Sequence, residues 1–422
     1  MLSIPELMAF GILAFFLLLP IYWDWRLLQV LWHTSVRTIA PPTYLPRATA
    51  LLSLRGADPS LVDCLGGLLN QDYPQYTVCI VVDSASDPAW EEVQRILARG
   101  HPANVQVRVA VLAEHRDTCS LKVSGTLQAI AGLDDQIEVL AFIDGDVIPA
   151  RNWLRSLVEP LRDPGVGATT GFPWYAPTDT SWGTLVRYLW MAAAVMQMFS
   201  FRIAWAGSLA FHARVFRHPR ALERWSRSFS EDTGTFGLVR ELGLALRFVP
   251  EVMTVNPESI DLRSCYTFIR RQLFVTRFQH VWWTPLWMLN VGIIVAVLGA
   301  CGLLTVGLWA QAWTWVVGAA SLLGAYSLAW LLAWLGAEKC IRTIVRRQRA
   351  DIPDFPLSWK CVLAGPLTLG MHFGCLIAAL RVKEIAWRGI TYAIYGPHQL
   401  RMLEYQPYRP ADQVRRAGHS IL

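Results

Sequence analysis

Long apolar segments at both ends of the chain enclose a stretch of different character, and this arrangement limits the possible folds. The first run, from about Leu7 to Trp23, is close to the length that a helix needs to cross the hydrocarbon core of a bilayer. Two more runs, Pro285 to Trp309 and Ala312 to Leu335, are joined so closely that they predict a helical hairpin. A mean hydropathy of +0.32 agrees with a membrane-embedded protein.

Basic residues beside these runs predict the orientation of the chain. The first basic residue, Arg26, follows the first apolar run, whereas a secretory signal peptide carries its positive charge before the run. The positive-inside rule therefore places the following domain in the cytoplasm. A fourth apolar stretch, Val362 to Leu380, is interrupted by glycine and proline, and its basic flank leaves two alternatives, a spanning helix or a re-entrant segment.

The middle of the chain, from about Arg47 to Gln279, has the pattern of an α/β domain. Short runs rich in Val, Ile and Leu predict buried strands, at Ala48–Leu54, Thr77–Val82, Val105–Leu112 and Val139–Ile143. Ser60–Gln71 and Ala89–Arg99 are predicted helices between them. The apolar segment Leu185 to Phe211 contains two arginines, which favours a helix packed in the domain or lying at the membrane surface.

These patterns divide the chain into four parts. We predict an N-terminal transmembrane helix (1–25), a cytosolic α/β domain (26–282), a C-terminal membrane region with two spanning helices and one spanning or re-entrant segment (283–382), and a basic tail (383–422). The 38 basic and 32 acidic residues form no long basic block interleaved with aromatics, so nucleic acid is not an expected partner. Eight scattered cysteines, without a CxxC pair, predict no zinc site.

The sharpest local feature is the sequence Phe142-Ile143-Asp144-Gly145-Asp146, with two carboxylates just after a predicted strand. Alternate carboxylates at a strand end can hold a hard divalent cation and, through it, a diphosphate. A solvated turn with two aspartates is the alternative. Asp83 and Asp87 follow the predicted strand Thr77–Val82, at the strand end where ligands of parallel sheets bind, although Asp also favours ordinary turns.

Two further polar sites and a basic stretch are candidates for chemistry. In Ser230-Glu231-Asp232 a carboxylate could deprotonate an acceptor hydroxyl or cap the next helix. Lys122 precedes an apolar helix, where an ammonium could meet a phosphate, or it could be a surface lysine. The stretch Arg270-Arg271-Gln272 with Arg277 could anchor the domain to anionic lipids or stabilise a departing diphosphate.

In this order and spacing, these segments resemble the family 2-like inverting glycosyltransferases, and more narrowly the ceramide glucosyltransferases, from about Ala48 to Gln279. The densest similarity is Leu51–Leu61, LLSLRGADPSL, followed by Gln71–Tyr76 and Val81-Val82-Asp83. The motifs of the family fall at Lys122, at Asp144 and Asp146, at Gly171 to Pro173, and at Glu231 and Asp232.

This resemblance implies an α/β nucleotide-sugar-binding domain of the GT-A fold, inserted between N-terminal and C-terminal transmembrane helices. UDP-glucose is the implied donor and Mn²⁺ or Mg²⁺ the implied cofactor. The resemblance assigns the uracil to Asp83 or Asp87, the nucleotide to Lys122, ribose or metal to Asp144, and the metal to Asp146. It assigns the acceptor hydroxyl to Asp232, since inversion needs one in-line base.

One motif of the family departs from the pattern. Where Q/R-x-x-R-W should lie, the chain reads Ile269-Arg270-Arg271-Gln272-Leu273-Phe274-Val275-Thr276-Arg277, without the Arg-Trp pair. In processive polymer synthases this motif holds the acceptor end, so its loss favours single transfer of a hexose to a membrane lipid, such as ceramide or diacylglycerol. A polysaccharide synthase and a non-catalytic membrane scaffold are the alternatives. Arg271 and Gln272 stay candidates for donor binding.

Overall fold

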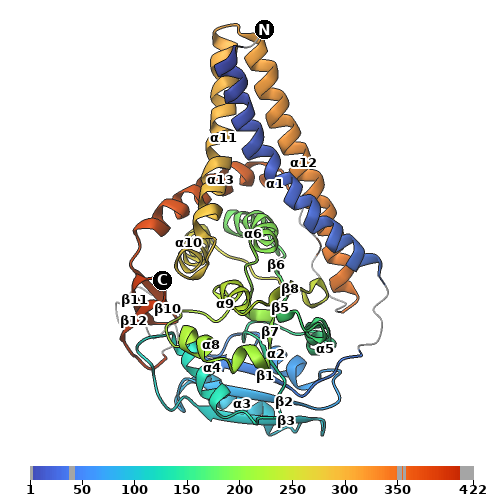
Figure 1. Cartoon of the computed structure of the whole chain (residues 1–422), viewed down its shortest axis with the longest axis vertical. Helices are drawn as coiled ribbons and strands as arrows, with labels where there is room; N and C mark the ends of the chain where they lie inside the picture. The colour runs from blue at the N-terminus through green and yellow to red at the C-terminus, as the bar shows by residue number, and fades with distance from the viewer. Residues whose placement is uncertain (1–2, 38–42, 349–353, 355–357, 409–422) are drawn as a thin grey trace.

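The computed structural model describes residues 3–37, 43–348, 354 and 358–408. Three helices, α1 (Ile4–Val36), α11 (Trp283–Trp309) and α12 (Trp313–Arg346), pack together into a stalk that stands above a wider domain (Figure 1). They and α13 (Lys360–Arg381) are long and apolar enough to cross a membrane. Helix α1 continues past the predicted boundary at residue 25, because its C-terminal part buries Leu27, Leu31 and Ser35 as it packs against α12 and the domain.

The domain is built around a seven-stranded sheet in the order β3-β2-β1-β4-β7-β5-β8. Strands β1 (Ala48–Leu54), β2 (Tyr76–Val82), β3 (Val105–Val111) and β4 (Val139–Phe142) are mutually parallel. All four predicted strands are present to within one residue at each end. Burial on both faces gives β1 and β4 the continuous apolar pattern of a parallel sheet, whereas the edge strand β3 alternates between partly buried and exposed residues. Their carboxyl ends meet at one edge, where ligands of such sheets bind.

The remaining elements complete the sheet and cover it. Strands β7 (Leu209–His212), β5 (Val166–Thr170) and β8 (Ala245–Phe248) extend the sheet, and β6 (Pro173–Tyr175) pairs with β9 (Thr254–Asn256). The shorter helices are α2 (Leu61–Leu69), α3 (Pro88–Leu97), α4 (Leu121–Ala131), α5 (Trp153–Val158), α7 (Ala213–Phe216), α8 (Pro219–Trp225) and α9 (Thr235–Glu241).

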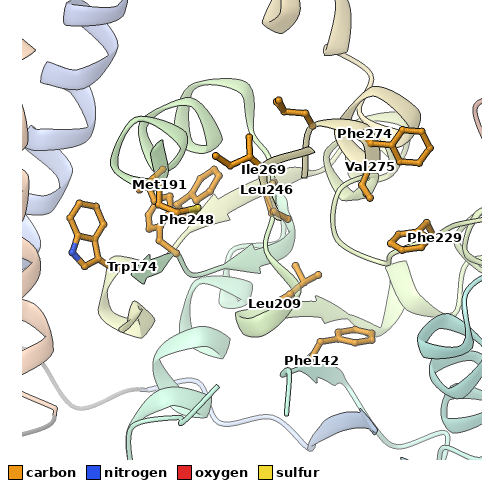
Figure 2. Close-up of a cluster of buried hydrophobic side chains, with 14 of the residues drawn as sticks. Phe142, Trp174, Met191, Leu209, Phe229, Leu246, Phe248, Ile269, Phe274 and Val275 are labelled. Atoms are coloured by element: carbon orange, nitrogen blue, oxygen red, sulfur yellow. The ribbon is translucent and has the colours of Figure 1, made fainter. Parts of the chain in front are cut away.

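Helices α6 (Trp182–Phe201) and α10 (Leu262–Gln279) lie between the sheet and the stalk. The first half of α6 is buried almost completely, so the apolar segment that contains it packs in the domain, one of the two predicted alternatives. Figure 2 shows the core that joins this layer to the sheet, where Phe142 and Leu209 on strands face Ile269 and Phe274 on α10. The core therefore fixes α10 above the carboxyl edge of the sheet.

Helix α13 lies obliquely below the stalk and packs on α6 and α10 (Figure 1). Near its N-terminus, the ring of Trp359 makes an edge-to-face contact with Trp182 of α6, with the ring centroids 6.3 Å apart. Near its C-terminus, the carbonyl of Ala379 accepts a hydrogen bond from Arg277 of α10 at 2.5 Å. Both ends of α13 therefore contact the domain, while Val362 and Leu363 leave an apolar face exposed.

The segment after α13, predicted as part of a basic tail, forms an antiparallel sheet of β10 (Glu384–Trp387), β11 (Ile390–Gly396) and β12 (Gln399–Glu404). Alternating apolar side chains explain this difference, since Ile390 and Tyr392 on β11 and Met402 on β12 all point into the core. The amide of Met402 also donates to the carbonyl of Asp117 at 2.7 Å. Residues 409–422 of the predicted tail lie outside the described residues.

Gly183 allows α6 to approach the start of α10, and this contact can be tested. A Cβ at position 183 would lie 2.1 Å from the carbonyl oxygen of Ile260, a backbone atom that cannot move without shifting α10. We expect Gly183→Ala to lower the free energy of unfolding by about 1–3 kcal/mol. Gly66→Ala in α2 is the matched control, because nothing lies within 4 Å of its added Cβ. Thermal unfolding in detergent measures both variants. A melting temperature of Gly183→Ala equal to that of Gly66→Ala would contradict this close contact.

Candidate functional site

A cavity of 480 Å³ opens at the carboxyl edge of the parallel strands. Its floor is the end of β1, β2 and β4, one side is α4, and the opposite walls are α10 and the turn between β10 and β11. Among the predicted site residues, the lining contains Asp83, Lys122, Asp144, Asp146 and Arg271. Parallel strands thus bring side chains from distant sequence positions to one edge, as predicted.

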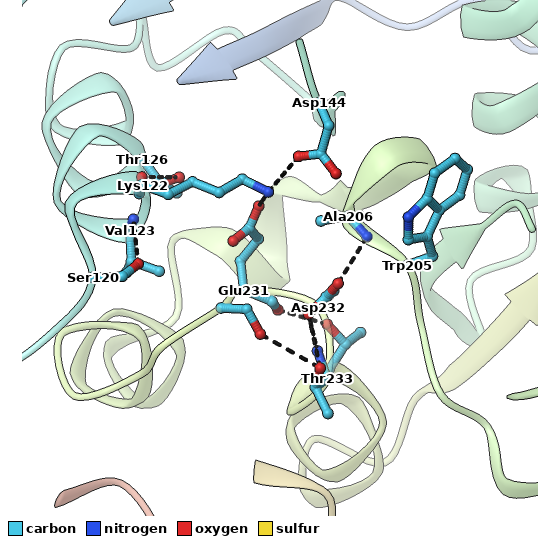
Figure 3. A network of polar contacts seen from close by, with 12 residues as sticks. Ser120, Lys122, Val123, Thr126, Asp144, Trp205, Ala206, Glu231, Asp232 and Thr233 are labelled. Carbon is cyan, nitrogen blue, oxygen red and sulfur yellow. Dashed lines mark hydrogen bonds and ion pairs between the residues drawn. The ribbon is translucent and has the colours of Figure 1, made fainter. Parts of the chain in front are cut away.

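Lys122 makes the central polar contact of this site (Figure 3). Its Nζ donates to Asp144 Oδ1 at 2.5 Å and lies 2.8 Å from Glu231 Oε1. Burial favours the neutral amine, but the carboxylates of Asp144 and Glu231 outweigh it and raise the pKa of Lys122. Burial raises the pKa of Glu231, an effect that Lys122 partly opposes. The ammonium therefore joins α4, the end of β4 and the Glu-Asp segment.

Local sequence explains why Lys122 reaches this position. Ser120 caps α4 by accepting a hydrogen bond from the amide of Val123 at 3.2 Å, so Lys122 lies in the first helical turn. Gly125, one turn further, lets α4 approach β1, since a Cβ there would lie 2.7 Å from Ser53 Oγ. Lys122 is therefore a largely buried bridging residue and not a surface lysine.

Asp146 lies at the cavity and carries a perturbed carboxyl group. The side chain opens onto the cavity, while protein encloses its other sides. This burial, together with the nearby carboxylates of Asp144 and Asp58, raises the pKa of Asp146 to about 6. An adjoining cavity of 110 Å³ is lined by Asp144, Asp146, Arg271 and Gln272. Arg271 and Gln272, the two candidates for donor binding on α10, therefore line the same cavity as the acidic pair.

Arg271 of α10 lines both cavities together with this acidic pair. Burial lowers the pKa of its guanidinium, while Asp146 and Asp144 act in the opposite direction. Within the described residues, no ion pair or hydrogen bond of the Arg271 side chain is found. A charged group that is enclosed without a protein partner is suited to receive an anionic ligand.

The two aspartates after β2 have different surroundings. The Asp83 side chain is 1% exposed, pairs with Arg55, and accepts a hydrogen bond from the Tyr405 hydroxyl at 3.2 Å. Asp87 is not among the residues that line the cavity, and its role as a nucleotide contact stays a prediction. It caps α3 by accepting from the amide of Ala89 at 2.8 Å, because Asp before a proline at the first helical position is a favoured cap.

A family model described as Glycosyl transferase family 21 matches residues 13–398 of the chain. The chain belongs to glycosyl transferase family 21. This membership confirms the resemblance to the ceramide glucosyltransferase family and identifies a glycosyltransferase with an α/β catalytic domain. Together with the four long apolar helices, it also identifies an integral membrane protein.

Solved structures resemble this family 21 glycosyltransferase at low identity. The mannosyltransferase PcManGT from Pyrobaculum calidifontis, in complex with GDP-Man and Mn²⁺, is 17% identical, with 88% of this chain and 99% of that chain covered and a TM-score of 0.49. Glucosyl-3-phosphoglycerate synthase from Mycobacterium tuberculosis, in complex with phosphoglyceric acid, is 14% identical, with 56% and 85% covered and a TM-score of 0.36. Both TM-scores are below 0.5, so the assignment of the glycosyltransferase rests on the family match.

Asp232 of the glycosyltransferase is half-buried next to Glu231 and lies outside the lining of both cavities. Its Oδ1 accepts from the amide and hydroxyl of Thr233, and its Oδ2 accepts from the amide of Ala206 at 3.0 Å (Figure 3). A carboxylate oxygen has two lone pairs, so Oδ2 retains one for a further donor. These contacts fix the orientation of the carboxylate.

Sequence reasoning missed three residues that line the cavity, Asp58, Trp387 and Arg388. Arg388 donates to Asp58 Oδ2 at 2.7 Å, which joins the C-terminal sheet to the loop after β1. A signal was present in the alternating pattern on both sides of Arg388-Gly389, which is typical of a β-hairpin. That pattern alone does not show which surface the hairpin covers.

Removal of the Lys122 charge tests the buried cluster. Lys122→Met leaves Glu231, whose side chain is 0% exposed, beside Asp144 without its cation, so we expect a loss of about 3–5 kcal/mol in the free energy of unfolding. Lys122→Met/Glu231→Gln should recover part of that loss. Glu231 in the single variant has a folded-state pKa above its unfolded value, so its stabilising contribution disappears as pH rises.

The measurement is the melting temperature of wild type, single variant and double variant between pH 5 and pH 8. The melting temperature of Lys122→Met should lie below that of wild type by the least at pH 5 and by the most at pH 8. The double variant should lose this pH dependence. An identical melting temperature for wild type and Lys122→Met at pH 8 would contradict the role of the ammonium in holding the cluster.

Proposed function

We propose that this glycosyltransferase transfers a hexose, glucose from UDP-glucose, to the hydroxyl of a membrane lipid such as ceramide, in a single inverting transfer. The observation that carries the proposal is the position of the cavity. Its acidic pair, Asp144 and Asp146, lies at the carboxyl edge of the sheet, while α10 and the end of α13 wall it on the side of the stalk. A water-soluble donor and a lipid can therefore meet at one place.

Asp144 and Asp146 are suited to hold Mn²⁺ or Mg²⁺, since carboxylate oxygens are the ligands that hard divalent cations prefer. Burial, together with the carboxylates of Asp144 and Asp58, raises the pKa of Asp146, and a bound cation would stabilise its charged form. Within the described residues, no group of three or more potential ligands is found. The cation would therefore need further ligands, which the donor diphosphate can supply; when bound, it neutralises the diphosphate.

The cations of the cavity would bind the rest of the donor. Arg271 faces the acidic pair without a partner among the described residues and is placed to bind the diphosphate, with Gln272 beside it. Asp83 lies at the end of β2, where the resemblance assigns the uracil, and its hydrogen bond from Tyr405 shows that it accepts from a neutral donor. Lys122 fixes Asp144 and contributes positive charge.

Asp232 is the proposed base for the acceptor hydroxyl. Its Oδ2 retains a lone pair, and its fixed orientation suits proton transfer from one direction. The acceptor would reach it from the smaller cavity, which is lined by Trp205, the residue before the Ala206 that binds Asp232. As Asp232 takes the proton, the acceptor oxygen would form a bond to the anomeric carbon while the bond from that carbon to the diphosphate oxygen breaks, and UDP would leave. Attack from the face opposite the departing diphosphate inverts the anomeric carbon in one displacement.

The lipid acceptor is proposed from the surroundings of α13. Its exposed apolar side chains, such as Val362, Leu363 and Phe373, would lie in the bilayer surface, while its C-terminal end leads to Val382 at the cavity. A lipid could present its headgroup there without withdrawing its tails. Because both ends of α13 contact the domain, we place the following sheet and the domain on the same side, the cytoplasmic face predicted from basic residues.

The proposal predicts a labelled lipid as product. Purified protein in nanodiscs is incubated with radiolabelled UDP-glucose, Mn²⁺ and a panel of ceramide, diacylglycerol and sterol, and the lipids are separated by chromatography. Asp146→Ala and Asp232→Asn should each lower the rate by at least about 100-fold. Glu92→Gln, a partly exposed carboxylate of α3 that does not line the cavity, is the matched control and should retain the wild-type rate. A growing water-insoluble polymer, or no transfer from the donor, would reject single lipid transfer.

The proposed metal site predicts a pH dependence of cation binding. Asp146 keeps its proton up to about pH 6, and the proton and the cation compete for the same carboxylate. Mn²⁺ affinity should therefore rise about tenfold from pH 5 to pH 7. Electron paramagnetic resonance of free Mn²⁺ measures this, and Asp146→Asn should bind weakly with little pH dependence. Equal affinity of the wild type at both pH values would contradict the assignment of Asp146 as a ligand.

A further inference from the structure

The hairpin turn between β10 and β11 has an unusual residue at a strained position. Trp387 pairs with Ile390, so the turn contains only Arg388 and Gly389, with φ of 48° and 79°. Such two-residue turns favour Asn or Asp followed by Gly, because both central residues have positive φ. Arginine in the left-handed region is unfavourable, and such strain tends to occur at functional sites.

Contacts on both sides hold Arg388 against the loop after β1. Its Nη2 donates to both oxygens of Asp58 at 3.0 and 2.7 Å, and its Nη1 donates to the carbonyl of Arg55 at 2.8 Å. The carbonyl of Arg388 accepts from Nε of Arg55 at 2.9 Å. These bonds orient the guanidinium at the cavity edge and leave it 29% exposed.

These bonds do not use all the donors of Arg388. A guanidinium has five N–H groups, and the bonds found within the described residues leave the Nε–H and one Nη1–H for another partner. The positive charge of the guanidinium also partly offsets the rise in the pKa of Asp146. Arg388 and Arg271 therefore act on the same acidic residue from two different walls of the cavity.

We propose that Arg388 binds the phosphate groups of the donor from the C-terminal sheet, on the wall of the cavity formed by β10 and β11. The inference rests on the proposed function, since it takes a nucleoside diphosphate sugar as the ligand. A planar guanidinium with two remaining N–H groups matches phosphate oxygens, and its attachment to Asp58 orients it before the donor arrives. The C-terminal sheet is then part of the donor site and not an appended tail.

Binding of UDP and of uridine to the full-length protein with Mn²⁺ tests this role. We expect Arg388→Ala to weaken UDP binding about tenfold or more, because a charge-assisted bond to phosphate is lost, and to leave uridine binding unchanged. Arg388→Lys should bind UDP with an affinity between those of wild type and Arg388→Ala, since lysine keeps the charge but lacks the planar guanidinium. Arg401→Ala is the matched control, an exposed arginine of β12 in the same sheet, and should bind UDP as wild type does.

Two further measurements separate ligand binding from a structural role. Hydrogen exchange of residues 384–404 reports whether the sheet stays folded in Arg388→Ala. Asp58→Asn weakens the ion pair but keeps the guanidinium, so it should weaken UDP binding much less than Arg388→Ala does. Equal losses in the two variants, or UDP binding by Arg388→Ala equal to wild type, would overturn the inference. Failure of wild type to bind UDP, GDP, ADP or CDP would instead overturn the proposed donor class.

Discussion

The buried ammonium of Lys122 is the contact on which the arrangement of the site depends. It joins α4, the end of β4 and the Glu-Asp segment through Asp144 at 2.5 Å and Glu231 at 2.8 Å. Without this cation, two enclosed carboxylates would face each other at high cost. One charge therefore fixes Asp144 for the proposed metal and places Asp232, the residue after Glu231, beside Ala206. The proposed binding and base residues share a single electrostatic support.

A second buried carboxylate connects the membrane helices to this support. Glu338 of α12 accepts from Trp174 at 3.1 Å and from the Tyr188 hydroxyl at 2.7 Å, and it pairs with Arg342 on its own helix. Trp174 belongs to β6, close in sequence to the strands of the main sheet, and Tyr188 belongs to α6. The stalk is therefore attached to the domain by specific polar contacts as well as by apolar packing, which suits a proposed reaction between an aqueous donor and a lipid.

Much of the fold and part of the site could be predicted from local patterns. The parallel strands and the long apolar helices have strong periodic or continuous signals, and Asp144 and Asp146 follow a buried strand. The sequence could not separate the possible roles of Asp87, because turns, helix caps and ligand sites use the same residue type; its contact with the amide of Ala89 shows that it caps α3. The absence of the Arg-Trp pair in α10 gave no indication that Trp387 and Arg388, more than 100 positions later, line the same cavity.

Features that depend on neighbours along the chain could be predicted from the amino-acid sequence: membrane helices from length and hydropathy, strands from apolar runs, and the family from the order of its motifs. Features that depend on long-range contacts became visible only in the folded structure. That structure buries Lys122 between two carboxylates, returns both ends of α13 to the domain, and makes the C-terminal segment a wall of the cavity. The reason is physical, since burial, pairing of charges and cavity shape arise only when distant segments pack together, and no local pattern contains them.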